Sequence, residues 1–391
     1  MTTAANPIPR APRKRANRFR VFWTRITEGL ELEQLWGQFL SEAKASYDLY
    51  SRDVDWDEIA RTKRGPRRFW RASWAVFQAM LMKLSPARRV LLLIAMVFIV
   101  VRPDVGGGGG QSQVGFQLGW VGTVILFVLL ALELADRVTM KRDLEIAREI
   151  QQRLVPQKAP DVAGFDIAFA TRPQNTVAGD YYDAFLRPLP DSAGSRQLLI
   201  VVADVAGKSV PAALLMATFQ ASLRALAATS SSLGEIVSGL DRYTRANNMD
   251  GGRFTTAFIA QIDPQTRELE YTNAGHNNPI LRRASGPVER LSIGGPPFGL
   301  PLFSDGELVY ESAKVQLGRG DLLFIFTDGL VEAINDRGEE FGESRLLPRI
   351  QSAPDEPAAV TWQRVITEVN SFTGYTRQHD DITGMVLRLG A

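Results

Sequence analysis

The chain has 391 residues, and its 45 Lys and Arg nearly balance its 43 Asp and Glu, so the net charge of +2 indicates no particular class of partner. This length allows two or three domains with full hydrophobic cores. The chain has no cysteine, which excludes a disulfide framework, thiolate metal sites and a cysteine nucleophile. Its 2 histidines are too few for a His-rich zinc site.

Residues 1–84 are interpreted as a cytoplasmic, basic and partly helical N-terminal region. Basic residues outnumber acidic ones about two to one over residues 1–89, and Trp70 and Trp74 lie where aromatic rings gather beside membranes. One alternative is a basic amphipathic segment that lies on the anionic inner leaflet. The other is a solvated tail with a small helical subdomain, and the charge pattern does not decide between them.

Residues 85–135 are predicted to form a transmembrane helical hairpin with a glycine-rich loop. The apolar run at 115–135 is about long enough to cross a bilayer, which takes roughly 20 residues. The shorter run at 90–101 suffices if it begins near residue 85 and Arg88 and Arg89 extend to the interface. Basic residues flank both outer ends, so the positive-inside rule places both termini in the cytoplasm. The expected location is the inner (cytoplasmic) membrane, multi-pass; a buried hairpin in a soluble protein is the alternative.

Residues 136–160 are predicted to form a linker helix that ends at Pro156. A short coiled-coil-like seam follows from the spacing of Met140, Leu144, Ala147, Ile150 and Leu154. This seam predicts a possible homodimer through residues 135–155, or a helix that transmits a signal. The alternative is that the stripe packs on the domain that follows.

Strand and helix signals alternate over residues 161–391. Strands are predicted at 165–171, 197–205, 255–263, 268–274, 308–315, 321–327 and 383–389. Helices are predicted at 211–228, 233–249, 342–351 and 357–371. Grouped strands with paired helices between them favour a layered α+β sandwich, and no P-loop or dinucleotide motif occurs. No nucleic-acid partner is expected.

Four aspartates in short acid-rich turns stand out in this half of the chain: Asp180 in VAGDYYD, Asp204 in VVADVAGKS, Asp328 in FIFTDGL and Asp380 in HDDIT. Two of them follow apolar runs that read as buried strands, and isolated carboxylates near a core are costly unless they are paired or metal-bound. Several converging carboxylates indicate an oxygen-preferring cation such as Mg²⁺ or Mn²⁺. An aspartate taken singly is more often a turn or capping residue, so the argument rests on the whole set.

Seven motifs occur in a fixed order over residues 145–391: EIAREIQQRLVPQKAP, VAGDYYD, ADVAGKSVPAALLM, NAGHNNP, GGPPFGL, FTDGLVEA and HDDIT. This series resembles the bacterial SpoIIE/RsbU-like branch of the PPM family of metal-dependent protein serine/threonine phosphatases. The resemblance implies a PPM-type ββ-sandwich flanked by helix pairs at 161–391, with two Mn²⁺ or Mg²⁺ ions at one edge. It does not cover the first 140 or so residues.

The resemblance also implies roles for single residues. The catalytic residues would be Asp180, Asp204, Asp328 and Asp380. The metal ligands would be Asp180, Asp204, the backbone carbonyl of Val205, Asp328, Asp380 and Asp381. Of the last acids, Asp381, together with Asp183, would be either a secondary ligand or a residue that holds the ligands from outside. Close turns beside the ions would need Gly179, Gly207 and Gly329. Asn273 and His276 would be structural or would support the metal ligands, with a direct catalytic part for His276 as the alternative.

Two departures from the family pattern are visible. Ala178 stands where many relatives have glycine, and Lys208–Ser209 stands where many have His-Gly, which puts a proton-donor role there in doubt. Arg172 either reaches a substrate phosphate or is a solvated charge.

The function expected from these features is a membrane-anchored, metal-dependent phosphatase acting on phosphoserine or phosphothreonine of a regulatory protein. By resemblance, that protein would be an anti-sigma-factor antagonist in a partner-switching pathway. Two metal ions can neutralise a phosphate monoester and activate water for its very slow hydrolysis. The alternative is a membrane-tethered binding module without turnover, which would tolerate substitution of the aspartates. A nucleotide cyclase is disfavoured by the later TDG and DDIT motifs.

Overall fold

The computed structural model describes residues 66–100, 112–189, 196–207, 210–247, 252–300 and 308–390. Residues 1–65 of the predicted N-terminal region, the glycine-rich loop at 106–110 and the pair Lys208–Ser209 lie outside the described residues. Contacts within the chain divide it into two compact units, Met1–Asp136 and Arg137–Ala391. The division falls inside one helix, α6 (Ser112–Leu154). The second half of α6 is the predicted linker helix, and it continues without a break from the first half.

The described part of the first unit consists of α4 (Pro66–Lys83), α5 (Pro86–Val100) and the beginning of α6. α5 and α6 pack closely: Ala95 is fully buried, and a Cβ atom added to Gly122 would lie 2.8 Å from the Ala95 carbonyl oxygen. Near the start of α5, the Arg88 guanidinium pairs with Asp136 at 2.6 Å and Glu133 at 3.2 Å. Within the described residues, α5 and the beginning of α6 are therefore two closely packed helices.

Most large apolar side chains of this hairpin are exposed. They are Val90, Leu91, Leu93, Ile94, Met96, Val97, Ile99 and Val100 on α5, and Trp120, Val121, Val124, Phe127, Val128, Leu130, Leu132 and Leu134 on α6. Among the described helices, only α7 (Val210–Thr229) combines the length and mean hydropathy expected of a membrane span. One face of α7 is buried in the core of the second unit. The transmembrane assignment of 85–135 stays a prediction.

Two β-sheets form the centre of the second unit. The strands of the first sheet, in spatial order, are β1 (Phe165–Arg172), β11 (Ile382–Leu389), β10 (Leu322–Phe326), β6 (Ile280–Arg282) and β7 (Val288–Arg290). The second sheet consists of β2 (Tyr181–Pro188), β3 (Arg196–Val205), β4 (Thr255–Ile262), β5 (Glu268–Ala274) and β8 (Gly294–Gly295), with β9 (Ala313–Gln316) paired to β5. All described pairings are antiparallel except β5 with β8.

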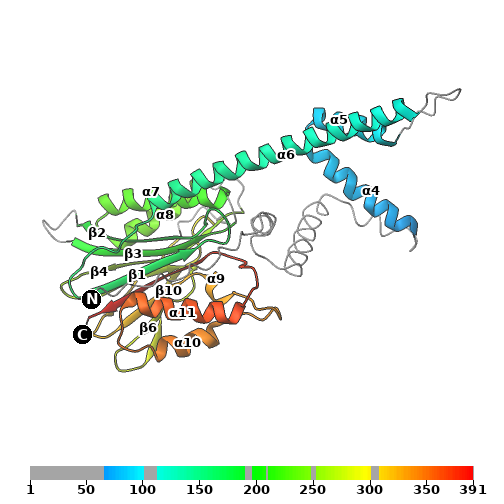
Figure 1. Ribbon diagram of the computed structural model, residues 1–391. Helices are drawn as coiled ribbons and strands as arrows, with labels where there is room; N and C mark the ends of the chain where they lie inside the picture. The colour runs from blue at the N-terminus through cyan, green and yellow to red at the C-terminus, as the bar shows by residue number, and fades with distance from the viewer. Residues whose placement is uncertain are drawn as a thin grey trace, which may run out of the picture. The chain divides into compact units, whose positions relative to one another are not determined.

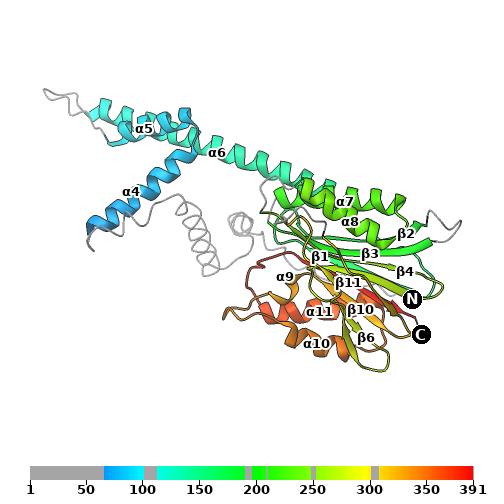
Figure 2. The same ribbon diagram turned by 180° about the vertical axis from the view of Figure 1, so that it is seen from behind.

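The two sheets face each other across an apolar core and carry helices on their outer faces (Figures 1 and 2). Ile200 and Phe258 of one sheet and Ile325 and Met385 of the other lie in this central core. α7 and α8 (Leu233–Ala246) cover the second sheet. The first sheet is covered by α9 (Asp328–Val331), α10 (Glu343–Gln351) and α11 (Ala358–Thr373). The predicted layered α+β sandwich is confirmed for this unit.

The sequence analysis missed β2 as a strand. Its residues YYDAFLRP include an aspartate, an arginine and a proline, which weaken any strand pattern. These charges are nevertheless buried because each has partners: Asp183 accepts two hydrogen bonds from Arg224, and the Arg187 guanidinium donates to the Ser230 carbonyl and to Gln261. The strand predicted at 308–315 is also shorter than expected, since only Ala313–Gln316 pairs with β5.

Candidate active site

The four predicted catalytic aspartates lie at the ends of neighbouring strands. Asp180 directly precedes β2, and Asp204 is the second-last residue of β3. Asp328 follows the end of β10, and Asp380 precedes β11. β2 pairs with β3 in one sheet, and β10 pairs with β11 in the other. The same edge of the sandwich therefore carries all four positions.

A threonine connects the acids from the two sheets. The Thr327 hydroxyl donates to the Asp180 carboxylate at 2.9 Å and accepts a hydrogen bond from the Thr383 backbone N–H at 3.0 Å. Thr327 is fully buried, immediately before Asp328. The sequence analysis assigned it no role, although it belongs to the FTDGLVEA motif. It holds the β2 edge against the β10–β11 edge.

The pKa values of the clustered carboxyl groups are raised. Burial raises the pKa of Asp180 well above its ordinary value, and repulsion from Asp204 adds to this. Burial likewise raises the pKa of Asp204 to about 7, with repulsion from Asp328, Asp380 and Asp381 acting in the same direction. The structure thus brings all five predicted acidic ligands close enough to interact, and their negative charges are poorly compensated by the protein alone.

Asp381 uses both carboxylate oxygens to hold the loop before Asp180. One oxygen accepts the backbone N–H of Gln174 at 2.6 Å, and the other accepts that of Gly179 at 2.7 Å. These bonds favour a positioning role for Asp381. Its assignment as a metal ligand stays a prediction.

Two of the three predicted glycines lie where a side chain would not fit comfortably. A Cβ atom on Gly329 would lie 2.1 Å from the Asp381 carbonyl oxygen, and one on Gly179 would lie 3.2 Å from the Val205 carbonyl oxygen. The second contact places the Val205 carbonyl, a predicted metal ligand, beside the turn that carries Asp180. Gly207 differs, because nothing lies within 4 Å of its Cβ position and its φ of +116° is what favours glycine.

The chemistry of these groups fits Mn²⁺ or Mg²⁺. Every candidate ligand offers oxygen, and the buried carboxylates raise one another's pKa values, as expected of acids that require a cation. Over the described residues, no three or more acidic, histidine or cysteine side chains already form a coordination shell. The donor set therefore fits such ions, and the ligand assignments are proposals.

Asp183 lies outside this group of contacts. Its carboxylate pairs with the Arg224 guanidinium of α7 at 2.7 Å and accepts a 2.6 Å hydrogen bond from the Tyr181 hydroxyl. The predicted role as a secondary metal ligand is therefore corrected: Asp183 fastens β2 to α7. A sequence cannot reveal this partner, because Arg224 is 41 residues away.

Asn273 and His276 bond to each other and to the chain around them. The Asn273 amide accepts the His276 backbone N–H at 2.7 Å and donates to the His276 carbonyl at 3.0 Å. The Nδ1 atom of His276 lies 3.0 Å from the Thr256 hydroxyl. Burial lowers the pKa of His276 to about 4, so its imidazole is neutral at pH 7. These contacts suit a structural role.

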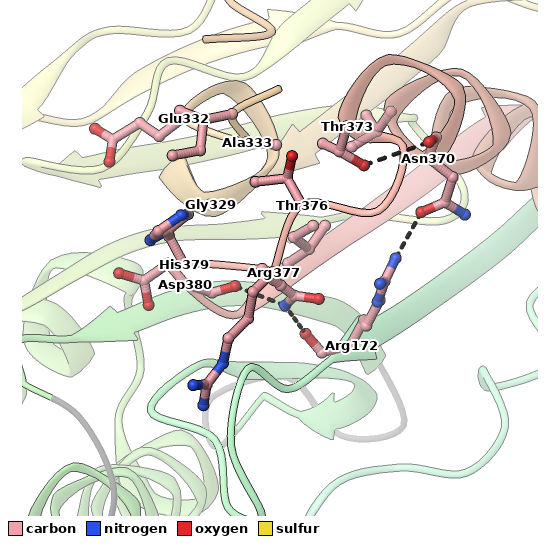
Figure 3. Close-up of a pocket in the computed structure, with 14 residues that line it drawn as sticks. Arg172, Gly329, Glu332, Ala333, Asn370, Thr373, Thr376, Arg377, His379 and Asp380 are labelled. Carbon is pink, nitrogen blue, oxygen red and sulfur yellow. Dashed lines mark hydrogen bonds between the residues drawn. The ribbon is translucent and has the colours of Figure 1, made fainter. Parts of the chain in front are cut away.

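A pocket of about 140 Å³ lies beside Asp380 (Figure 3). It opens between the end of β1, α9, the end of α11 and the loop before β11, and its lining includes Arg172, Glu332, Asn370, Arg377 and His379. The Arg172 guanidinium donates to the Asn370 side chain at 2.6 Å. The pocket offers polar and cationic groups next to a predicted metal ligand.

Comparison with known proteins identifies the family. The family model "Stage II sporulation protein E (SpoIIE)" matches residues 194–390, about half of the chain. Protein IcfG of Synechocystis sp. is 26% identical over 347 residues, which cover 80% of this chain and 52% of that protein. Phosphoserine phosphatase RsbU of Bacillus subtilis is 27% identical over 253 residues, which cover 64% of this chain and 70% of RsbU. The matched region thus spans only about half of IcfG.

Among solved structures, the SiaA-PP2C domain of Pseudomonas aeruginosa has a TM-score of 0.56 and 22% identity, over 65% of this chain and 98% of that domain. This similarity shows that the second unit has a PP2C fold. The family match over residues 194–390 identifies the chain as a member of the SpoIIE family, and its second unit has the PP2C fold.

Proposed function

We propose that this protein is a membrane-anchored, metal-dependent phosphatase that hydrolyses phosphoserine or phosphothreonine on a regulatory protein. The observation that carries the proposal is the convergence of Asp180, Asp204, Asp328 and Asp380 at one edge of the sandwich, where burial and mutual repulsion raise carboxyl pKa values. Such a cluster lowers the stability of the protein unless cations occupy it. Cations bound there can activate water for hydrolysis, a role that a module which only binds a partner does not need.

In the proposed mechanism, the residues of the site hold the metal ions and orient one another. Asp180, Asp204, Asp328, Asp380 and the Val205 carbonyl would hold two Mn²⁺ or Mg²⁺ ions. Bound there, such ions supply neutralisation of the phosphate charge and activation of a water molecule. Thr327 orients the Asp180 carboxylate through its hydroxyl, and Asp381 fixes the preceding turn through Gly179. No side-chain nucleophile is needed in this scheme.

The substrate class is proposed from similarity to RsbU and RsbP of Bacillus subtilis, which are named phosphoserine phosphatases. By the same resemblance, the substrate would be an anti-sigma-factor antagonist in a partner-switching pathway. The cationic groups beside Asp380, Arg172 and Arg377, are suited to an anionic phosphoprotein surface.

Membrane anchoring is proposed from the α5–α6 hairpin. Its outward side chains are largely aliphatic, including Val97, Val124 and Leu130, which are 52%, 57% and 66% exposed. An apolar patch of this extent is unfavourable in water and suits a lipid or protein environment. With the basic flanks of the hairpin in the cytoplasm, the phosphatase domain would be cytoplasmic too.

A homodimer through residues 135–155 is also proposed, but only some of the predicted seam residues are exposed enough to contact a second copy. Within the predicted seam, Met140 and Ile150 are 60% and 58% exposed, whereas Leu144, Ala147 and Leu154 are half-buried. Val138 and Ile146 in the same segment are also exposed. Two short heptads pair weakly, and anchoring in a membrane would raise their local concentration.

The proposed activity is tested with the full chain in detergent, using p-nitrophenyl phosphate and then a phosphoserine protein as substrates. Turnover should require Mn²⁺ or Mg²⁺ and should fall at least a hundredfold in Asp204→Asn and Asp328→Asn. Asp336→Asn, which changes an exposed turn aspartate, serves as the matched control. Retained binding of a phosphoprotein by the two site variants, with no turnover in the unchanged protein, would instead support the binding-module alternative.

A further inference from the structure

Two arginines flank the same residue at one end of the first sheet. Arg282 is the last residue of β6 and Arg388 is the second-last residue of β11, and each pairs with Leu322 of β10. Residues directly opposite each other in antiparallel strands point their side chains to the same face. Leu322 belongs to the core beneath α10 and α11, so both arginines lie on that face, with Cα atoms about 10 Å apart.

This end of the sheet is distant from the catalytic aspartates. Arg388 lies six residues beyond the first residue of β11, which corresponds to about 20 Å along the strand. Leu322 is the first residue of β10, whereas Asp328 follows the other end of that strand. A small ligand held by the two arginines would therefore not touch the proposed metal site.

Both arginines are buried, but they differ in their partners. Arg388 is 4% exposed and donates to the Asp355 carboxylate at 2.6 Å and to the Pro354 carbonyl oxygen at 2.8 Å. Arg282 is 8% exposed and makes no hydrogen bond within the described part of the chain, and the Nε atoms of both arginines are buried without a partner. Burial, together with repulsion from the Arg388 charge, lowers the pKa of Arg282.

The next residue of the chain, Arg283, shows how a guanidinium at this end of the sheet is otherwise neutralised. It pairs with the Glu289 carboxylate at 2.6 Å and with the Asp321 carboxylate at 2.9 Å. Over the residues that the structure describes, Arg282 has no such ion pair. The contrast marks Arg282 as a cation without the carboxylate partner that its burial calls for.

The acids closest to Arg388 are used elsewhere. Asp355 pairs with Arg388, but its own side chain is 76% exposed. Asp166, which is opposite Arg388 in β1, accepts the Ala358 backbone N–H at 2.7 Å. The guanidinium of Arg282 is therefore left with unused N–H donors in a largely desolvated place, which is unfavourable unless an acceptor binds there.

We propose that Arg282 and Arg388 form a binding site for a phosphate group, brought by inorganic phosphate or by a nucleotide. A guanidinium presents its N–H donors in a planar fork that matches two oxygens of a phosphate. Arg282 binds the phosphate with its unused donors, and Arg388 adds a second positive charge. Asp355 opposes this binding, because its carboxylate competes for Arg388. The site does not depend on the proposed phosphatase activity.

The test is isothermal titration calorimetry of the full chain in detergent, freed of metal ions and at low ionic strength. Inorganic phosphate and adenosine monophosphate are the two probes, and without metal ions the clustered aspartates repel both of them. Arg282→Gln should weaken binding at least about tenfold, because it removes charged hydrogen bonds. Asp355→Asn should strengthen binding by about threefold, because it removes an exposed competing charge. Arg337→Gln, in an exposed turn, removes one positive charge elsewhere and should leave the affinity unchanged.

The two probes distinguish the sources of the phosphate group. Similar affinities assign the site to free phosphate, and a tighter affinity for adenosine monophosphate assigns it to a nucleotide. Arg282→Lys, which keeps the charge but not the planar fork, should bind with intermediate affinity. If Arg282→Gln fails to fold, the exposed Asp355 position decides. Absence of binding of both probes to the unchanged protein overturns the proposal, as does an equal loss in Arg337→Gln or an unchanged affinity in Asp355→Asn.

Discussion

The buried carboxyl groups of Asp180 and Asp204 lie close enough to influence each other's pKa, and Asp328, Asp380 and Asp381 act on Asp204 as nearby negative charges that raise its pKa. Such an arrangement is unfavourable in isolation, because burial and like charge both oppose ionisation. The protein compensates part of this with neutral donors, above all the Thr327 hydroxyl and the backbone N–H groups bound by Asp381. The remaining negative charge is what a metal ion would neutralise.

His276 predicts a pH dependence of stability. Its pKa is about 4 in the folded protein, against an ordinary value of 6.5, because its imidazole is buried. Below pH 6.5 the unfolded chain therefore binds more protons than the folded chain, and stability is lost as pH falls from 6.5 to about 4. The expected loss is on the order of 3 kcal/mol.

Urea unfolding of the metal-free protein between pH 7.5 and 4.5 measures this effect. His276→Gln should show a flatter dependence on pH than the unchanged protein. The other histidine of the chain, His379, is exposed, so His379→Gln should keep the original slope. Equal slopes in all three proteins would contradict the assignment of a neutral, buried His276.

At the scale of secondary structure, the site depends on how closely α9 approaches the residues before β11. Gly329 is the contact point, since its Cβ position lies 2.1 Å from the Asp381 carbonyl oxygen. The added methyl group of Gly329→Ala would meet this backbone oxygen, which cannot move aside as the end of a flexible side chain can. We therefore expect the two backbone segments to separate and Asp328 to move away from Asp380.

We expect Gly329→Ala to lower stability by about 2 kcal/mol or more and to reduce turnover at least tenfold. Gly179→Ala is the matched comparison, because its Cβ would meet the Val205 carbonyl oxygen at the milder distance of 3.2 Å. Thermal unfolding and Mn²⁺-dependent hydrolysis measure both effects. A fully stable and active Gly329→Ala protein would show that this close approach is unnecessary.

Much of the element pattern could be predicted from the sequence. β3, β4, β5 and β10 are β-branched or apolar runs bounded by turn residues, and they lie within one or two residues of the expected ranges. The strand β2 could not be predicted in this way, because its charged residues are buried only through distant partners such as Arg224 and Gln261. The same limit hid Thr327, whose role depends on contacts with residues far along the chain.

At the scale of the whole molecule, the two units differ in what they expose. The unit at Arg137–Ala391 buries three apolar cores beneath its helices and between its sheets. The described helices of the other unit expose most of their large apolar side chains. This contrast, and not the fold of the catalytic unit, is the physical basis for proposing a membrane anchor.

Extraction of membranes tests the anchor directly. The full chain should remain in the membrane pellet after treatment with sodium carbonate at pH 11 and should enter the soluble fraction only with detergent. Substitution of Leu93, Val97, Val124 and Leu130 by serine removes exposed apolar side chains from both helices and should release much of the protein. Complete release of the unchanged chain by carbonate would contradict an integral anchor.

The continuity of α6 has a consequence for helical phase. From Thr123 to Leu154 the helix contains neither proline nor glycine, the usual causes of kinks. A residue inserted into such a helix turns the part of the helix before it by about 100° relative to the end of the helix at Leu154, whereas seven inserted residues restore the original direction to within about 20°. Activity of insertion variants between Arg137 and Leu144 should therefore vary periodically with the number of residues added, and the period itself would report that information passes along the helix as rotation.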